Sequence, residues 1–407
     1  MSQTFKGDVT NNVVELNLQA GAANIGSSSY RLGNTNNGEI LTVTNGDFPD
    51  YNLGSNPYYN DANFRGLVIG TSCTTIGSYA FFYCWDWTAN GGLGAGLAGS
   101  LVIPDSVTSI GDRAFGSCPG LTGELVIPDS VTSIGDRAFN SCEGLTGTLT
   151  LGNSVTTIGN GAFAYCNGLT GVLDIPDNIT VINNNVFNEC SSFTSLILHN
   201  NITSIGLFTF SSCSSISGAL NLPDSLTTIG NDCFSGCSSL TSLTLPINPS
   251  FNTIGARTFS NCTSMTGNLI IPSNVTTIES AAFEYCSFTG NLNIPDTVTT
   301  IGTFCFRTNN FTSITIGSGL TAIPNGLMYL CASLTGTLVL PSTVASVGNN
   351  AFNGCAFTRI EYYRTSPPPT SVNPFAGGNN ATEIHVPAAS SWVAGSTWNG
   401  LTVIKDL

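Results

Sequence analysis

The chain has 407 residues, of which 41% are hydrophobic and only 8% are charged, and its formal net charge is −14. The hydrophobic fraction can supply a large core and excludes intrinsic disorder. The charged fraction is far below the value of about 25% in an ordinary globular domain. Because lysine occurs only at Lys6 and Lys405 and no basic cluster is present, nucleic acid and anionic membranes are excluded as favoured partners.

Residues 1–66 form a non-repeating segment. VVELNL at 13–18 and EILTV at 39–43 are predicted strands, and a tyrosine-rich irregular stretch follows at 46–64. The N-terminus has no apolar core behind a basic start, so no signal peptide is predicted. No run of 18 apolar residues occurs, which argues against membrane insertion.

The rest of the chain is built from an internal repeat. LVIPDSVTSIGDRAF occurs at 101–115 and again, unchanged, at 125–139. One such unit cannot bury its own apolar edge, whereas stacked units share a continuous core. We therefore predict a β-rich solenoid in which equivalent residues superpose. The units open at Leu67, Leu101, Leu125, Leu149, Leu173, Leu196, Leu220, Leu243, Leu269, Leu292, Ile314 and Leu338, with weaker ones at Ile360 and Ile384.

Each unit has the same predicted parts. In the unit that opens at Leu101, residues 101–103 alternate as a strand with one face inward, and Pro104 ends it because proline cannot donate to a strand ladder. Residues 105–106 form a turn, and 107–110 form a second extended stretch. Apolar residues at helical offsets over 114–121 predict a short helical turn.

The motif LxIPxxVTxIGxxAFxxCxxL resembles the BspA-like leucine-rich repeats. The resemblance implies a right-handed superhelix with a parallel strand ladder, and surface adhesins without catalytic residues. We divide the chain into a cap or docking segment at 1–66, twelve repeats at 67–359, and degenerate repeats with a C-terminal cap at 360–407. In that cap, Trp392 and Trp398 are expected to seal the final coil.

Fourteen cysteines are present, and eleven stand three residues after the phenylalanine slot, with Asn309 interrupting the series. Paired short spacings of the zinc-site type are absent. Because every cysteine occupies a small core slot, we predict a ladder of buried, reduced thiols stacked beside the phenylalanines. The structural ladder is exemplified by Phe115, Phe139, Phe163 and Phe187 and by Cys118, Cys142, Cys166 and Cys190.

Catalytic and metal chemistry find little support. Asp105 and Asp129 follow the strand-ending prolines, where aspartate is a turn former; Ca²⁺ binding by adjacent coils is the weaker alternative. His199 and His385 are about eight repeats apart and are expected to be surface residues. We predict no cofactor and no enzymatic activity.

Two places could bind a partner. The first is the outward face of the opening strands, a weakly charged strip that is otherwise plain solvated surface. The second is an insertion at 85–100 in the first unit, whose tryptophans would either stack on sugars or fold back as a lid. The candidate residues are Val102, Glu124, Val126, Thr148, Thr150 and Asp174 in the strip, and Trp85, Asp86 and Trp87 in the insertion.

These features predict a non-enzymatic binding or adhesion protein that recognises a protein or glycan surface. Lack of a signal peptide together with reduced cysteines favours assembly in the cytoplasm and later exposure on a virion or cell appendage. The alternative is a structural subunit whose copies self-assemble or dock through residues 1–66. An intracellular scaffold is a third hypothesis, and a hydrolase is the last.

Overall fold

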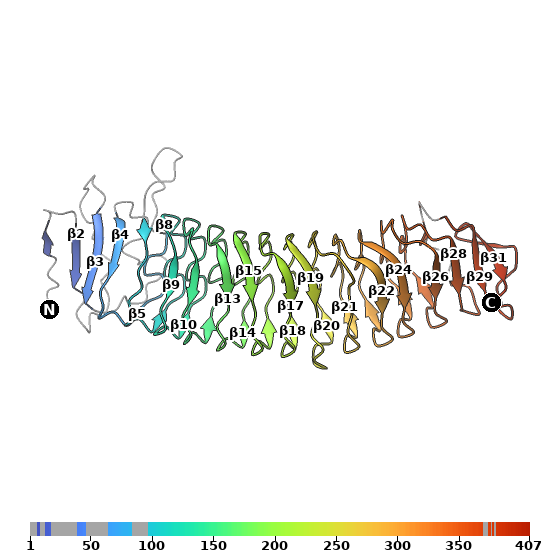
Figure 1. Ribbon diagram of the computed structural model, residues 1–407, viewed down its shortest axis with the longest axis horizontal. Coiled ribbons are helices and arrows are strands. Elements are labelled where there is room, and N and C mark those ends of the chain that lie inside the picture. Colours follow the sequence, from blue (N-terminus) through green and yellow to red (C-terminus); the bar gives the residue numbers. More distant parts are fainter. Residues whose placement is uncertain are drawn as a thin grey trace. The chain divides into compact units, whose positions relative to one another are not determined.

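The computed structural model describes residues 6–8, 13–17, 39–45, 64–83, 97–368, 373–375, 377 and 380–407, and only the backbone of residues 6–8, 13–17, 39–45 and 64–66. Contacts divide the chain into a first unit, residues 1–202 with 208–216, and a second unit, residues 203–207 with 217–407. Each unit is a parallel β-solenoid (Figure 1). No helix occurs in the described part of the chain.

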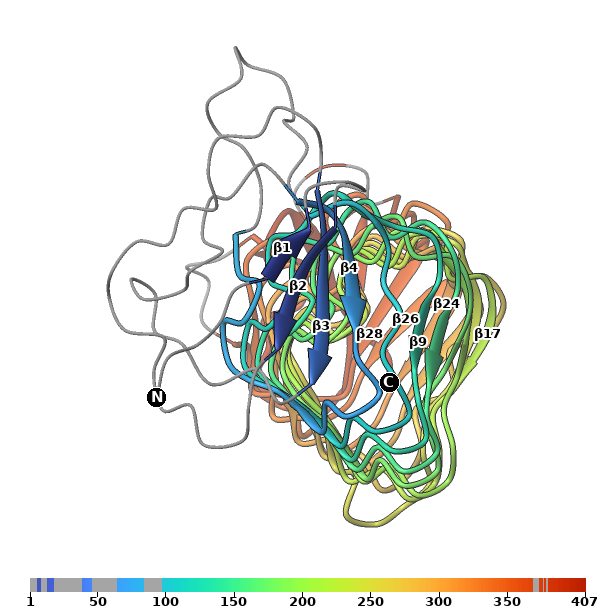
Figure 2. The same cartoon turned by 90° about the vertical axis from the view of Figure 1, so that its left-hand side faces the viewer.

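The first unit begins with a four-stranded sheet of β1 (Lys6–Asp8), β2 (Val13–Asn17), β3 (Glu39–Asn45) and β4 (Phe64–Ile69). Strands β2, β3 and β4 are parallel neighbours (Figure 2), and β1 is antiparallel to β2. The strands predicted at 13–18 and 39–43 are therefore present. They pair in the direction of the first repeat strand and cover its open edge.

Two ladders of strands follow in the first unit. The strands at the opening of each coil are β6 (Gly99–Ser100), β8 (Leu121–Thr122), β9 (Leu125–Ile127), β11 (Leu149–Leu151), β13 (Gly171–Asp174) and β15 (Phe193–Ile197). The short second strands are β5 (Thr75–Ile76), β7 (Ser109–Ile110), β10 (Ser133–Ile134), β12 (Thr157–Ile158) and β14 (Val181–Ile182).

The second unit has the same two ladders. Its opening strands are β17 (Gly218–Asn221), β19 (Leu240–Thr244), β22 (Thr289–Ile294), β24 (Asn310–Ile316), β26 (Thr337–Leu340), β28 (Arg359–Tyr362), β29 (Glu383–Val386) and β31 (Leu401–Lys405), which is closed by antiparallel β30 (Thr397–Trp398). Its short strands are β16 (Ser204–Ile205), β18 (Thr228–Ile229), β20 (Thr253–Ile254), β21 (Thr277–Ile278), β23 (Thr300–Ile301), β25 (Ala322–Ile323) and β27 (Ser346–Val347).

The strand register confirms that equivalent residues superpose. Leu125 pairs with Leu149, and Ile110 pairs with Ile134, each pair being 24 residues apart. In the first repeat Ile76 pairs with Ile110 despite the 34-residue spacing, so the insertion does not disturb the register. The division of the chain at residues 66 and 359 stays a prediction.

The core of the first unit is a stack of phenylalanine rings. Phe115, Phe139 and Phe163 have ring centroids 5.3 and 5.4 Å apart with nearly parallel planes, and all three are fully buried. The ring separation exceeds the strand spacing of about 4.8 Å, as expected for offset stacking. Identical letters recur along the sequence because each coil presents the same pocket to the next.

The turn predicted after the opening strand is also present. The Val107 amide donates to the Pro104 carbonyl at 3.0 Å, and Val131 repeats the bond to Pro128 at 3.1 Å. In the C-terminal cap, Trp392 and Trp398 are buried against each other and against Tyr362 and seal the last coil as expected.

The prediction of a short helical turn over 114–121 is wrong. Arg113 and Ser117 have φ values of 53° and 57°, in the left-handed region that interrupts a right-handed helix. This alternation turns the amides sideways: Arg113 and Phe115 donate to carbonyls of the next coil, at Asp136 and Ala138. Bonds between coils therefore alternate with short bonds along the chain, such as those from the Ala114 amide to the Gly111 carbonyl and from the Gly116 amide to the Arg113 carbonyl, and the continuous series of a helix is absent here.

Candidate functional site

The outward face of the opening strands is exposed and weakly charged. Val102 is 69% exposed and Val126, which lies in β9, is 43% exposed, because their neighbours Leu101 and Leu125 point inward. The other predicted residues of this strip, Glu124, Thr148, Thr150 and Asp174, are exposed as well. We call this surface the sheet face. Its geometry suits contact with a partner; which residues make that contact stays a prediction.

The predicted insertion site cannot be placed. Trp85, Asp86 and Trp87 lie outside the described residues. The hypotheses of a sugar-stacking loop and of a lid stay predictions.

Asp174 makes a contact that the sequence did not suggest. His199 Nε2 lies 2.9 Å from Asp174 Oδ1, and His199 Nδ1 lies 3.0 Å from Asp177 Oδ1. Each ring nitrogen of His199 therefore faces a carboxylate oxygen. His199 thus links two consecutive coils of the first unit, and Asp174 is partly occupied by it.

The cysteine ladder is confirmed and has a further role. None of the thirteen cysteines of the described residues forms a disulfide bond, and all are buried. The Cys142 thiol donates to the Phe115 carbonyl of the preceding coil at 3.0 Å, and Cys166 repeats the bond to Phe139. The slot therefore selects a small side chain that can also donate a hydrogen bond.

Burial controls the chemistry of these thiols. It raises the pKa of Cys142 and Cys166 well above its ordinary value, and it raises the pKa of Cys286 to about 12. A thiolate is the reactive form of cysteine, so these side chains are inert in the folded protein. They belong to the scaffold and not to a reactive site.

Asn309 fits this ladder instead of breaking it. Its Nδ2 donates to the Phe283 carbonyl of the preceding coil at 2.8 Å and to the Phe306 carbonyl at 3.1 Å, while its Oδ1 accepts from the Phe288 amide at 3.2 Å. The side chain is almost fully buried. The amide thus supplies the donor that a cysteine supplies in other coils.

We expect Asn309→Ala to lower the free energy of unfolding by about 1–3 kcal/mol, because the buried Phe288 amide loses its acceptor. Asn309→Cys should lose less, since a thiol restores a donor toward Phe283. Urea denaturation of both variants against the unchanged protein checks this order. Equal losses would contradict a role for the donor.

The aspartates considered for Ca²⁺ act within turns. Asp129 Oδ1 accepts a hydrogen bond from the Asn153 amide of the next coil at 2.7 Å. Asp105 occupies the equivalent exposed turn position one coil earlier. In the parts of the chain that the structure describes, no group of three or more His, Cys, Asp or Glu side chains could hold a metal ion.

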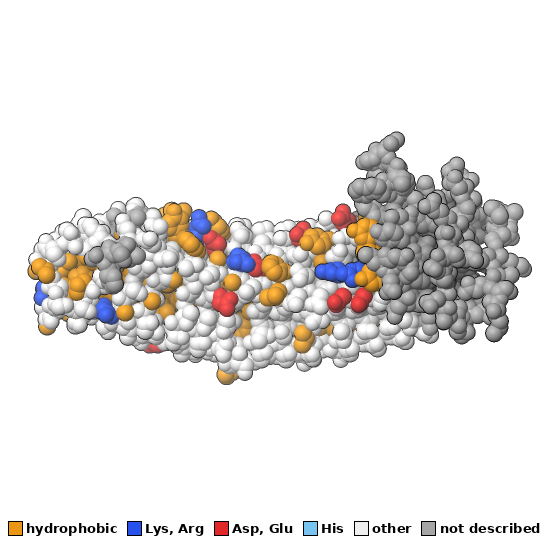
Figure 3. Space-filling model, turned by 180° about the vertical axis from the view of Figure 1, so that it is seen from behind, with side chains coloured by type: hydrophobic (Ala, Val, Ile, Leu, Met, Phe, Trp, Pro, Cys, Tyr) orange, Lys and Arg blue, Asp and Glu red, His pale blue; other side chains and the backbone are white. Residues whose placement is uncertain are grey.

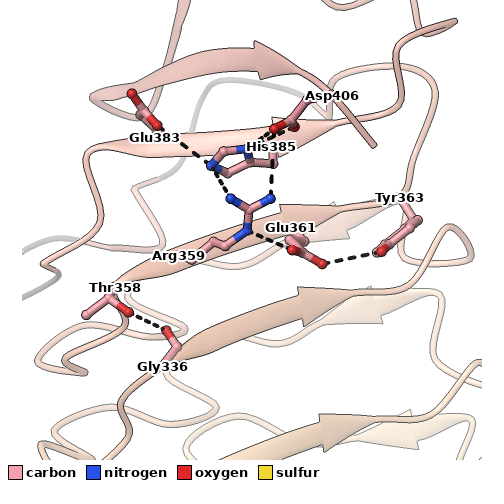
Figure 4. A network of polar contacts seen from close by, with 8 residues as sticks. All are labelled: Gly336, Thr358, Arg359, Glu361, Tyr363, Glu383, His385 and Asp406. Atoms are coloured by element: carbon pink, nitrogen blue, oxygen red, sulfur yellow. Dashed lines mark hydrogen bonds and ion pairs between the residues drawn. The ribbon is translucent and has the colours of Figure 1, made fainter.

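A polar network at the C-terminal end of the second unit was not foreseen (Figure 4). Arg359 Nε contacts Glu361 Oε1 at 2.7 Å, and Arg359 Nη1 lies 3.1 Å from His385 Nε2. His385 Nδ1 lies 2.9 Å from Asp406 Oδ1. Since arginine can only donate, Nε2 accepts from Arg359 and Nδ1 donates to Asp406. These side chains contact one another across neighbouring strands, so the network joins those strands.

The expectation that His385 is a surface residue is wrong, because only 7% of it is exposed. The sequence held a weak signal for this network. Arg359, Glu361 and His385 stand in outward slots of the last strands, where most other coils have Ser, Thr, Asn or Val. Their contact depends on pairing across 26 residues.

A second set of exposed side chains stands in the turns that follow the short strands, between the positions equivalent to Gly111 and Cys118 in each coil. Figure 3 shows one face on which charged and hydrophobic side chains gather in small patches on an otherwise uncharged surface. In the second unit, Arg307 lies over the rings of Tyr285, Phe304 and Tyr329 at 5.0, 5.5 and 5.2 Å, and contacts Glu284 at 3.1 Å. This charge is thus already paired.

These features define a class of protein, a parallel β-solenoid with stacked phenylalanine and cysteine columns and an exposed sheet face. Residues 51–88, 97–217, 171–288 and 252–368 match the family described as BspA type leucine rich repeat region, in six copies. The matches cover more than half of the chain, which therefore belongs to the BspA-type leucine-rich repeat family. The resemblance inferred from the repeat motif is confirmed.

Two solved structures have a similar fold. A leucine-rich repeat protein from Bacteroides ovatus ATCC 8483 has a TM-score of 0.60 and 23% identity, covering 89% of this chain and 93% of its own. A leucine rich cell surface protein from Faecalibacterium prausnitzii A2-165 has a TM-score of 0.52 and 21% identity, covering 100% of this chain and 95% of its own. At these identities the similarity shows the fold alone.

No curated protein is significantly similar to this chain. Within the described residues, no helix has the length and apolar character needed to cross a membrane.

Proposed function

We propose that the protein is a non-enzymatic binding or adhesion protein that presents its sheet face to a protein or glycan surface. The observation that carries this proposal is the exposure of Val102 and Val126, at 69% and 43%, at equivalent positions of consecutive coils. Exposed aliphatic side chains on a flat, weakly charged sheet are suited to an interface. The similar fold of a protein described as a bacterial cell surface protein supports the same role.

The side chains that could do general acid–base chemistry are engaged in structure. Both ring nitrogens of His199 contact carboxylates, and those of His385 contact Asp406 and Arg359. Within the described chain, neither imidazole is hydrogen-bonded to a serine, threonine or cysteine that it could activate. These contacts favour a binding role over catalysis.

The proposal predicts that Val102→Asp combined with Val126→Asp abolishes attachment, because each change places a charge in the middle of the contact area. A printed array of glycans and extracellular-matrix proteins, probed with the labelled full-length protein, provides the readout. The matched control is Val393→Asp, since Val393 is 67% exposed but lies outside the sheet face. Binding that survives the double change, or no binding to any spot, would contradict the proposal.

For the location of the protein, we propose exposure on a virion or cell appendage. The buried cysteines, none of which forms a disulfide bond in the described residues, support assembly in a reducing compartment before exposure. Mass spectrometry of purified particles against fractionated cells tests this. Recovery only in the soluble cell fraction would overturn it.

The alternative proposal is an assembly subunit that docks through residues 1–66. In support, β2 and β3 from this segment continue the ladder of β4, so the segment covers an edge that would otherwise be open. Removing residues 1–66 should then convert oligomers to monomers in sedimentation experiments. If the shortened protein sedimented in the same oligomeric state as the full-length protein, the segment would have a capping role alone.

A further inference from the structure

A groove of about 490 Å³ crosses four consecutive coils of the first unit, between Thr75 and Gly159. It lies along the short strands β5, β7, β10 and β12, away from the opening strands of the sheet face. We call it the hydroxyl groove, because Ser109, Ser133 and Thr157 line it at equivalent positions of successive coils.

Two neighbouring columns of hydroxyl groups differ in what they contact. Thr108, Thr132 and Thr156 each donate from Oγ1 to a backbone carbonyl of the preceding coil, at 3.1 to 3.2 Å. The hydroxyl groups of the residues that follow them, which line the groove, make no hydrogen bond within the described residues. One column is therefore used by the fold, and the other remains available to a ligand.

The strand register fixes the spacing of the available hydroxyl groups. Ser133 pairs with Ser109 on one side and with Thr157 on the other. Equivalent atoms of neighbouring parallel strands are about 4.8 Å apart. The groove thus presents the same donor and acceptor at each step along its length.

Carboxylates add acceptors at the same repeat. Asp112 Oδ1 accepts from the Asp136 amide at 2.8 Å, and Asp136 Oδ1 accepts from the Asn160 amide at 2.6 Å. Asp112 therefore uses one oxygen to join coils, whereas Asp136 uses both, since its Oδ2 also accepts from Asn160 Nδ2 at 3.5 Å. In Asp112 the second oxygen has no partner in the described part of the chain, and it can accept from a ligand hydroxyl.

The lining excludes other ligand classes. The isoleucines beneath it, Ile76, Ile110 and Ile134, are at most 2% exposed, so the groove offers no large aliphatic side chain to an apolar anchor. No lysine or arginine lines it, so the only charged side chains that an anionic ligand would meet are the carboxylates of Asp112 and Asp136. Strands β7 and β10 are paired on both sides, so an added peptide strand finds no open edge there.

We propose that the hydroxyl groove binds a neutral, linear oligosaccharide, with successive sugar units placed along successive coils. Such a ligand carries hydroxyl groups that donate to the aspartates and exchange hydrogen bonds with the serine and threonine hydroxyls. It also repeats along its length, as the groove does. This site is separate from the sheet face, so either can be disproved without the other.

Isothermal titration of the full-length protein with cellohexaose, chitohexaose and maltohexaose tests the proposal. We expect at least one of these sugars to bind. For that sugar, the affinity should rise from its disaccharide to its tetrasaccharide, because the longer chain engages more coils. Ser109→Ala combined with Ser133→Ala should weaken that affinity about tenfold or more, since two hydrogen bonds are lost. Asp112→Asn, which keeps the Oδ1 acceptor for the Asp136 amide, should weaken it by less.

The matched control is Thr277→Ala combined with Thr300→Ala, at equivalent positions of the second unit that do not line the groove. It should leave the affinity unchanged, and thermal melting should show that both double variants are folded. The proposal is overturned if none of the three sugars binds at millimolar concentration, or if both double variants lose affinity equally. Tighter binding of the anionic hexagalacturonate than of any neutral sugar would also overturn it.

Discussion

Replacing Phe139 with alanine is expected to lower the free energy of unfolding of the first unit by about 3–5 kcal/mol. The ring is fully buried and stacks on Phe115 and Phe163 at 5.3 and 5.4 Å. Its removal leaves a cavity between two coils that cannot approach each other, because their strands are held in register on both sides. Both the transfer free energy of the ring and the packing of its two neighbours are lost.

Phe208→Ala is the matched control, because Phe208 is 38% exposed and belongs to the same unit. It should change the free energy of unfolding by less than about 1 kcal/mol, as expected for a surface position. Urea denaturation followed by circular dichroism measures both variants. If Phe139→Ala were tolerated as well as Phe208→Ala, the ring stack could not be the main source of cohesion between coils.

The register, the core columns and the first turn could be predicted because they depend on the repeat itself. Once one residue such as Leu125 is placed inward, stacking fixes the orientation of the equivalent residues in the other coils. The opening strand ends at the proline, because proline has no amide donor. The same logic placed the cysteines, since a slot between buried rings admits only a small side chain.

The left-handed turns could not be predicted, because many of the residues that adopt them are not of the types that favour a positive φ. Arg113 and Ser117 stand where glycine would adopt a positive φ at no cost. Their conformation is set by hydrogen bonds to the next coil, which no local pattern reveals. The apolar offsets of a helix and of this turn are the same, so the sequence favoured the wrong one.

The site residues show a similar limit. Exposure of Val102 follows from the inward and outward alternation of residues 101–103 and was foreseen. Burial of His385 was not, because it depends on Arg359 and Asp406, which pair with it from other coils. The hydroxyl groove could not be predicted from the sequence either. Thr108 and Ser109 both carry a hydroxyl group, and only the structure shows that the hydroxyl group of Thr108 donates to a backbone carbonyl while Ser109 lines the groove.

The second large effect concerns alkaline pH. Burial raises the pKa of the ladder thiols in the folded state, so they remain protonated where an unfolded thiol, with a pKa of about 8.5, ionises. The unfolded state then binds fewer protons, and stability present below pH 8.5 is lost as the pH rises toward the folded pKa. Each thiol is expected to contribute a loss of about 1 kcal/mol between pH 8.5 and 9.5, and the loss approaches about 1.4 kcal/mol per pH unit at higher pH, where the unfolded thiol is fully ionised.

Coils that unfold together add their contributions, so stability should fall steeply between pH 8.5 and 9.5. Urea denaturation under a reducing agent at closely spaced pH values measures the slope. Tyrosines contribute little in this window, because an ordinary tyrosine has a pKa near 10 and burial raises the pKa of Tyr362 to about 12.

A variant with alanine at Cys142, Cys166 and Cys190 isolates the contribution of the thiols whose pKa is raised by burial. If the first unit unfolds as one body, its slope well above pH 8.5 should be smaller than that of the unchanged protein by about 4 kcal/mol per pH unit. The variant will also be less stable at neutral pH, so the slopes are compared and not the absolute values. Identical slopes would mean that the thiols are solvated in the folded protein, which a closed stack of coils does not allow.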